Sequence, residues 1–254
     1  MQQLLWEGDT PRGHYQVIDT LYDGRKSRVL YSGDRQAAQS GIPKDDNPRL
    51  LFDYNQRMFE IVTALKPRAM LVVGGGVFTL PTALLHELPA LHIDAVEPDE
   101  GLTELAERFF DLPDDDRLRI YNTDGRSFLR EHPDRYDLIF IDAYMHTTIP
   151  RELKTRQAFA AYHAHLKSGG LLTMNVISGY EGQHARVLKE VCAAAKLSFD
   201  SVDLYLAGSG YSLWLPQNFV LTAQSGTYIP LEAYTHGEPK GLPEGYNQAV
   251  IEDD

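Results

Sequence analysis

The chain is expected to adopt an α/β fold, in which a doubly wound seven-stranded sheet follows a small antiparallel β unit. After Pro67, continuous apolar runs such as AMLVV and YDLIFI alternate with helical segments. This alternation is typical of a parallel sheet that helices cover on both faces. Before that point, β-rich stretches such as HYQVIDTLY and SRVLYSG are separated by the turn sequence DGRK, which predicts hairpins.

The elements can be justified in order along the chain. Apolar side chains at helical spacing predict a helix over Arg49–Leu65, which Pro67 ends. The next elements are the strand AMLVV, a helix from Thr79, the strand LHIDAV, a helix from Glu100, the strand RLRIY, a short helix from Asp124 and the strand YDLIFI. A helix over Thr155–Leu166, the strand GLLTMNVI, a helix over Glu181–Ala195 and the strands SFDSVDLYL and NFVLTA complete the sheet.

These patterns divide the chain into three parts. Residues 1–48 are predicted to form the N-terminal β-hairpin domain, which ends in the turn-rich segment GIPKDDNP. Residues 49–225 are predicted to form the doubly wound, ligand-binding domain. Residues 226–254 are rich in Pro, Gly and acidic residues, so we expect a polar tail or a surface-draped extension.

The composition is that of a globular protein with an acidic excess. Of 254 residues, 43% are hydrophobic, and 24 basic against 36 acidic side chains give a net charge of −12. This charge repels phosphate backbones and anionic lipid, so we expect no nucleic-acid or membrane partner and favour small cationic molecules. The single cysteine, Cys192, allows no internal disulfide, and the N-terminus lacks a signal-peptide pattern. A cytoplasmic location is expected.

Glycines and an acid follow the first two strands of the main domain. Gly74, Gly75 and Gly76 come directly after AMLVV, where absent side chains allow a ligand to approach the backbone closely. A plain tight turn is the alternative. Glu97 ends the next strand, 21 residues after Gly76, at the distance where an acid accepts both hydroxyls of a ribose. Alternatively, Glu97 caps the helix that follows Pro98.

Two further acids follow the next two strands. Asp124-Gly125 lies after RLRIY, and the Asp124 carboxylate either accepts a hydrogen bond from an adenine amino group or caps the helix DGRSFLRE. Asp142 leaves the buried strand YDLIFI at its carboxyl end and is the strongest candidate for a general base, against a turn-forming role. His146 follows on the same loop, as a proton relay or as an ordinary exposed histidine. The nine histidines show no ligand spacing, so no metal is expected.

The segments VVGGG, VEPD, NTDGRSFL, YDLIFIDAY and LKSGGLLTMNVIS, preceded by HYQVIDTLY, resemble the spermidine synthase family of polyamine aminopropyltransferases. That family has a Rossmann-like fold of the S-adenosylmethionine methyltransferase type. The resemblance implies decarboxylated S-adenosylmethionine as the co-substrate, with Glu97 on the ribose, Asp124-Gly125 at the adenine, and Gln36 and Gly74–Gly76 along the ligand. It also implies that Asp142 is the base, that a small cationic amine is the acceptor, and that the chain forms a homodimer.

The chain departs from the family pattern where that pattern carries acids. Val77 stands where the family has an acid after its glycines, and Met145 stands three positions after Asp142, where a second acid is usual. These losses remove carboxylates expected to hold the ammonium groups of the donor and the acceptor. Compensation is expected from Glu181, Glu152, Tyr144 or His146.

Two other departures affect the predicted substrate pocket. FDYNQRM replaces the family's Tyr-His-Glu-Met, and we expect Tyr54 or Gln56 to take over part of its polar role. The family's late Pro-Thr-Tyr is absent, and Tyr211 is a candidate for its tyrosine. The sequence alone leaves the identity of the amine open.

Three functions therefore remain. The first is aminopropyl transfer from decarboxylated S-adenosylmethionine to an amine, with Asp142 as the base. The second is S-adenosylmethionine-dependent methyl transfer, which Val77 and Met145 favour and the N-terminal β unit opposes. The third is non-catalytic nucleoside binding, because one fold supports many functions.

Overall fold

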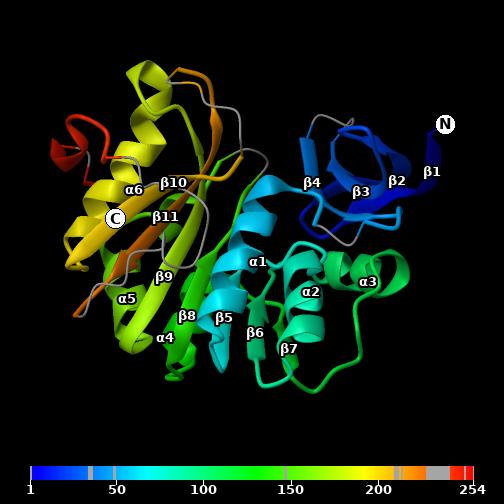
Figure 1. Cartoon of the computed structure of the whole chain (residues 1–254), viewed down its shortest axis with the longest axis horizontal. Helices are drawn as coiled ribbons and strands as arrows, with labels where there is room; N and C mark the ends of the chain where they lie inside the picture. The colour runs from blue at the N-terminus through cyan, green and yellow to red at the C-terminus, as the bar shows by residue number, and fades with distance from the viewer. Residues whose placement is uncertain are drawn as a thin grey trace.

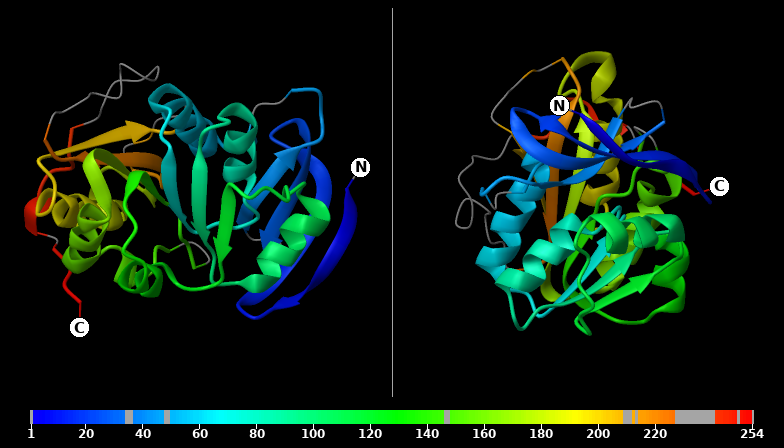
Figure 2. Two further views of the ribbon diagram at one scale, coloured as in Figure 1. Left: turned by 90° about the horizontal axis from the view of Figure 1, so that it is seen from below. Right: turned by 90° about the vertical axis from the view of Figure 1, so that its right-hand side faces the viewer.

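The computed structural model describes residues 2–33, 37–47, 50–145, 148–208, 212, 214–226, 241–248 and 250–253. These residues form two sheets that lie next to each other along the long axis of the molecule, with the chain ends on opposite sides (Figure 1). The N-terminal sheet lies beside helices α2 (Thr79–Glu87) and α3 (Glu100–Phe109), as all three views agree (Figures 1 and 2).

The N-terminal sheet is antiparallel, with the strand order β1-β2-β3-β4. Its strands are β1 (Gln3–Thr10), β2 (Gly13–Tyr22), β3 (Arg25–Ser32) and β4 (Ala37–Pro43). Asp23 and Gly24 join β2 to β3 with φ values of 48° and 77°, the conformation that a two-residue hairpin turn requires. The predicted antiparallel β unit is confirmed, and β1 and β4 extend it on either side of the hairpin.

The main sheet has seven strands in the order β10-β11-β9-β8-β5-β6-β7. The strands are β5 (Ala69–Val73), β6 (His92–Val96), β7 (Leu118–Tyr121), β8 (Tyr136–Ile141), β9 (Leu166–Ser178), β10 (Ser201–Leu206) and β11 (Gln217–Gln224). Strand order reverses between β5 and β8, so the carboxyl ends of these strands border the crevice where ligands bind in such sheets.

Helices cover both faces of this sheet, as the doubly wound prediction requires. One apolar core joins the sheet to α1 (Asp53–Leu65), α2 and α3, and the other joins it to α4 (Gly125–Glu131), α5 (Arg156–Ala164) and α6 (Arg186–Lys196). Short 3₁₀ turns at Arg151–Leu153, Gly182–Ala185 and Tyr246–Gln248 complete the described elements. Among the described residues, no helix is long and apolar enough to cross a membrane.

Two details differ from the expected elements. One strand runs against the others, since β11 pairs antiparallel with both β9 and β10. The chain has no helix between β10 and β11 in its described part, and parallel neighbours need a long crossover connection, usually a helix. Helix α1 begins at Asp53 rather than at Arg49, since Phe52 is extended, with φ −98° and ψ 135°. Its predicted end is confirmed, as the helix stops before Pro67.

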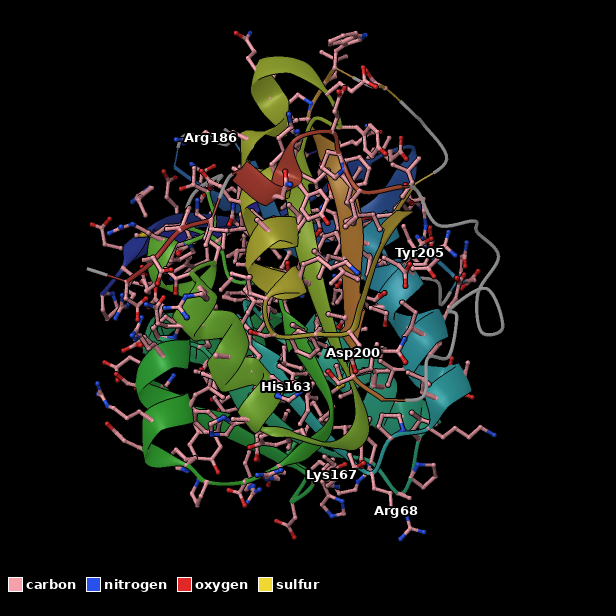
Figure 3. The ribbon with its side chains drawn as sticks, turned by 90° about the vertical axis from the view of Figure 1, so that its left-hand side faces the viewer. Arg68, His163, Lys167, Arg186, Asp200 and Tyr205 are labelled. Atoms are coloured by element: carbon pink, nitrogen blue, oxygen red, sulfur yellow. The ribbon has the colours of Figure 1, made fainter. Side chains whose placement is uncertain are left out.

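A carboxylate ties the starts of three strands together. Asp137 at the start of β8 accepts the backbone N–H groups of Arg68 and Ala69 at 3.0 and 2.9 Å, and Lys167 of β9 pairs with it at 3.0 Å. Arg68 and Lys167 lie close together at this end of the molecule (Figure 3). This end is opposite to the carboxyl ends of β5 and β8.

The described part of the predicted tail packs on the main domain. The turn at Tyr246–Gln248 contacts α6, and the Arg156 N–H donates to the Ile251 carbonyl at 2.8 Å. Glu252 pairs with Arg156, and Asp253 pairs with Arg126 and accepts a hydrogen bond from Thr155. Two basic helix segments therefore hold these acids at the surface.

Candidate functional site

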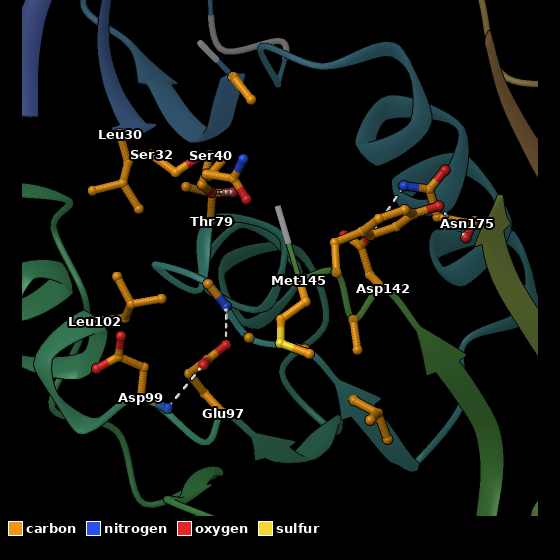
Figure 4. A pocket seen from close by; sticks show the side chains of 18 of the residues that line it. Leu30, Ser32, Ser40, Thr79, Glu97, Asp99, Leu102, Asp142, Met145 and Asn175 are labelled. Carbon is orange, nitrogen blue, oxygen red and sulfur yellow. Dashed lines mark hydrogen bonds between the residues drawn. The ribbon is translucent and has the colours of Figure 1, made fainter. Parts of the chain in front are cut away.

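A cavity of about 1060 Å³ lies at the carboxyl ends of β5, β6 and β8, between the main domain and the N-terminal sheet (Figure 4). Its wall includes Gly74–Gly76, Glu97, Asp124-Gly125 and Asp142. The acids and glycines that the sequence places after consecutive strands thus face one cavity. Ser40 from β4 and Thr79 from α2 approach each other above it, with their hydroxyl oxygens 3.4 Å apart.

The glycine turn after β5 is required by close backbone packing. Gly74 has φ +94°, and a side chain there would place Cβ 2.3 Å from the Asp142 carbonyl oxygen and 2.8 Å from the Ala143 Cα. The Gly74 N–H donates to the Val96 carbonyl at 2.9 Å, which joins the ends of β5 and β6. The turn therefore sets the distance between the strand ends that carry Glu97 and Asp142.

Gly74→Ala is expected to lower the free energy of unfolding by about 2–6 kcal/mol, because a strained φ and overpacking each cost about 1–3 kcal/mol. Gly24→Ala is the matched control, since Gly24 also has positive φ (+77°) but no atom within 4 Å of the added Cβ. Urea unfolding followed by circular dichroism measures both. If both variants lost the same free energy of unfolding, the contact of the added Cβ with the Asp142 carbonyl would contribute nothing to the destabilisation.

Glu97 is buried at the cavity wall, with 7% of its surface exposed. Its Oε2 accepts the Gly76 N–H at 2.9 Å and its Oε1 accepts the Asp99 N–H at 3.0 Å. Burial raises its pKa to about 6, and the backbone hydrogen bonds act against that rise. Asp99, not Glu97, caps the following helix by accepting the Gly101 N–H at 3.1 Å, so the capping alternative for Glu97 is wrong. The carboxylate is free to use its remaining lone pairs toward the cavity.

Asp124 caps a helix and also lines the cavity. It is the N-cap of α4, where its Oδ1 accepts the Ser127 N–H at 2.9 Å, and it also lines the cavity. Gly125 beside it lets the helix approach β5, because a Cβ there would lie 2.4 Å from a methyl group of Val73. The capping alternative is confirmed, and the carboxylate still borders the space next to Glu97.

Asp142 is anchored at the opposite side of the cavity from Glu97 (Figure 4). Asn175 Nδ2 donates to its Oδ1 at 2.8 Å, and the Tyr54 hydroxyl donates a second hydrogen bond. Burial raises the pKa of Asp142 to about 7, while these two hydrogen bonds lower it. A carboxyl group that titrates near neutrality is suited to exchange a proton with a ligand.

Tyr54 and Tyr144 both lie in the cavity wall. The Tyr144 hydroxyl donates to the Asn175 carbonyl at 2.9 Å and accepts the Ile177 N–H at 2.8 Å, so it braces β9. Met145 also lines the cavity and is 60% exposed. Val77 is fully buried in the core, so the residue after the glycines presents nothing to the cavity.

The other residues predicted for the substrate and cofactor sites either do not line the cavity or lie outside the described residues. Gln56 is not among the residues that line the cavity; its Nε2 donates to the Leu50 carbonyl at 2.6 Å, so its expected place in the substrate pocket is wrong. Gln36, His146 and Tyr211 lie outside the described residues. In the part of the chain that the structure describes, no three His, Cys, Asp or Glu side chains are grouped to hold a metal ion.

The structure adds residues that sequence reasoning did not single out. Asn175 contacts Asp142 directly, and Asn218 of β11 donates from Nδ2 to Asn175 Oδ1 at 2.9 Å. The available signal was one Asn within the apolar strand GLLTMNVI, since a polar side chain buried in such a strand needs a partner. Asn218 carried no comparable signal, because its contact depends on the pairing of β11 with β9.

Comparisons with known proteins point to one family. Residues 52–208 match the family described as spermine/spermidine synthase domain. A probable polyamine aminopropyl transferase of Bifidobacterium longum is 35% identical over 193 residues, which are 75% of this chain and 42% of that protein. The match therefore covers less than half the length of this relative.

Two solved structures share the fold. A probable spermidine synthase from Corynebacterium glutamicum has a TM-score of 0.80 at 19% identity, over 98% of this chain and 96% of that one. A spermidine synthase in complex with the transition-state analogue AdoDATO has a TM-score of 0.69 at 16% identity, over 98% of this chain and 84% of that one. Because the family match extends over more than half of the sequence and includes the glycine turn, Glu97 and Asp142, this chain belongs to the spermine/spermidine synthase family.

Proposed function

We propose that this chain is an aminopropyltransferase that moves an aminopropyl group from decarboxylated S-adenosylmethionine to a small cationic amine. Membership of the family supports the reaction type, and the related spermidine synthase in complex with AdoDATO supports the kind of donor. The observation that carries the proposal is a buried carboxyl group, Asp142, in the same cavity as Glu97.

The two ends of the cavity have different tasks in this proposal. Glu97 accepts hydrogen bonds from the ribose hydroxyls with the lone pairs that the Gly76 and Asp99 N–H groups leave unused. Asp124 lies beside it for the adenine amino group. The donor then extends from Glu97 past the glycine turn, so that its sulfonium comes near Asp142.

The reaction transfers one proton and exchanges one bond. The acceptor binds as an ammonium ion, and Asp142 takes a proton from it. The freed lone pair on nitrogen forms a bond to the aminopropyl carbon next to the sulfonium. The bond from that carbon to sulfur breaks, and its electron pair stays on sulfur, which leaves as a neutral thioether. The product is a secondary amine in its protonated form.

The charge of the cavity supports a cationic acceptor. Its described wall carries one arginine, Arg12, and seven carboxylates: Asp23, Asp53, Glu97, Asp99, Asp124, Asp142 and Glu152. Such a wall concentrates cations near Asp142 and repels anionic acceptors. Neutral Met145 near the cavity entrance leaves one side of the acceptor path without an acid.

Met145→Asp is expected to lower the KM for a diamine by a factor of about 1.4 to 5, since an exposed ion pair is worth about 0.2–1 kcal/mol. Met145→Asn is the control, because it adds polarity without charge. The measurement is KM at low and at 0.5 M salt, where screening should remove the gain. An unchanged KM at low salt would place Met145 outside the acceptor path.

The proposal is tested by incubating the purified chain with decarboxylated S-adenosylmethionine or with S-adenosylmethionine, and with a series of mono-, di- and triamines. Methylthioadenosine and the elongated amine are expected together, in equal amounts by mass spectrometry, and only with the decarboxylated donor. A methylated amine with intact S-adenosylmethionine would replace the proposal by methyl transfer. Tight donor binding without turnover of any amine would contradict catalysis.

A further inference from the structure

Three polar side chains from neighbouring strands form a row that ends at the proposed base. Asn218 of β11 donates from Nδ2 to Asn175 Oδ1 at 2.9 Å, and Asn175 of β9 donates from Nδ2 to Asp142 Oδ1 at 2.8 Å. Asn175 is 2% exposed, and both asparagines border the cavity. Figure 4 shows Asn175 directed at Asp142, with their hydrogen bond drawn.

The order of donors in this row is fixed by chemistry. An ionised carboxylate only accepts hydrogen bonds, so Asn175 has to present its NH₂ group to Asp142. Its carbonyl oxygen then points the other way and needs a donor, which the NH₂ group of Asn218 supplies. If Asn175 turned by 180°, its carbonyl would face the carboxylate and its NH₂ group would face that of Asn218. With its NH₂ group directed at Asn175, Asn218 favours the orientation of Asn175 that Asp142 requires.

This orientation matters because, among the residues that the structure describes, no positively charged group is a cause of the pKa shift of Asp142. The described groups that act on its carboxyl group are Asn175 and Tyr54, and both are neutral donors. Tyr54 on α1 and Tyr144 after β8 are the titratable groups that face it, and burial raises the pKa of both phenols further above neutrality. Neutral hydrogen bonds alone thus oppose the effect of burial on the carboxylate.

We propose that Asn218 is a positioning residue, which holds the amide of Asn175 with its NH₂ group toward Asp142 and thereby sets the ionisation of that carboxyl group. The relevance to catalysis rests on the proposed function, whereas the effect on Asp142 does not. The contact of Asn218 with Asn175 is made by its side chain. The antiparallel pairing of β11 with β9 uses backbone groups, so a substitution at Asn218 leaves this pairing in place.

The test is a titration of the Asp142 carboxyl carbon by ¹³C NMR, with Asp142→Asn used to assign the resonance. The wild-type pKa is expected at about 7. Asn218→Ala is expected to raise it by about half to one unit, because the hydrogen bond from Asn175 is weakened or lost. Asn218→Asp is expected to raise it more, since an added acceptor turns Asn175 around and adds a negative charge.

Thr222→Val is the control, because Thr222 is also a buried polar residue of β11 but does not line the cavity. Its Asp142 pKa is expected to equal the wild-type value. The proposal is overturned if Asn218→Ala and Asn218→Asp leave the pKa within 0.2 unit of the wild type, or if Thr222→Val moves it as far. Thermal unfolding of each variant checks that it is folded, and near-isosteric Asn218→Asp keeps the test available if the alanine variant does not fold.

The titration also separates this inference from the proposed function. If the enzyme transfers aminopropyl groups, the acid limb of its pH–rate profile is expected to move with the Asp142 pKa in each variant. If no transfer occurs with any amine, the proposed function fails and the NMR result still decides the role of Asn218. If the enzyme is active but the Asp142 pKa is the same in the Asn218 variants as in the wild type, the positioning role is rejected and the proposed function stands.

Discussion

Asp142→Asn is expected to lower the rate of aminopropyl transfer about 10²- to 10⁴-fold, the range typical of losing a general base. The amide is nearly isosteric with the carboxyl group and can still accept the hydrogen bond from Asn175. The cavity therefore keeps its shape, and the affinity for the donor at Glu97 should not change. Turnover at saturating donor and calorimetric titration of the donor measure the two quantities separately.

A second aspartate serves as the control for this variant. Asp200 is exposed before β10 (Figure 3) and is not among the residues that line the cavity, and its Oδ2 accepts the Gly226 N–H at 2.9 Å. Asp200→Asn is expected to retain full turnover. If Asp142→Asn retained more than a tenth of the wild-type rate, the acceptor would lose its proton before it reaches the site, and Asp142 would not be the base.

The pH dependence follows from the raised pKa of Asp142. The base acts as a carboxylate, so turnover is expected to fall as the pH drops through about 7. The contribution of Asp142 to the free energy of unfolding changes with pH in the opposite direction to turnover. The folded state binds this proton more tightly than the unfolded chain does, so its contribution favours folding at low pH and is lost between about 4 and 7. Asp142→Asn should therefore unfold at a higher temperature than the wild type at pH 8.

The sequence predicted the parts of the fold that depend on local patterns. Continuous apolar runs such as Ala69–Val73 and Tyr136–Ile141 identify buried strands. Their carboxyl ends place Gly74 and Asp142 at the same edge of the sheet as Glu97, which follows β6. The reversed direction of β11 was beyond such patterns, since it depends on how the chain returns to the sheet.

In the candidate site, too, only the residues whose place depends on a local pattern could be predicted. Side chains that follow a strand directly were placed correctly in the cavity wall, because strand geometry alone brings them there. Gln56 was misplaced because two residues make about half a turn of helix, so Tyr54 faces the cavity while Gln56 bonds to the Leu50 carbonyl. Asn218 reaches Asn175 only through the register of β11 on β9, which no local pattern specifies.

Glu97→Ala is expected to weaken donor binding by about two to four powers of ten. The ribose hydroxyls would lose two hydrogen bonds to a carboxylate, each worth about 1.5–3 kcal/mol, and 1.4 kcal/mol corresponds to a factor of ten. Glu97→Gln keeps one acceptor oxygen, so its loss should be about one to two powers of ten. Titration calorimetry with decarboxylated S-adenosylmethionine and with methylthioadenosine gives both values, and equal losses for the two ligands place the effect on the shared nucleoside.

The control for Glu97 has to separate ligand binding from its contacts with the backbone. Asp137 also accepts two backbone N–H groups, at the opposite end of the sheet, and Asp137→Asn should lower stability without changing donor affinity. Because the pKa of Glu97 is about 6, the wild type should bind the donor more weakly at pH 5 than at pH 8, and Glu97→Gln should lose this difference. Donor binding by Glu97→Ala at the wild-type level would mean that the carboxylate serves only to hold the turn at Gly76.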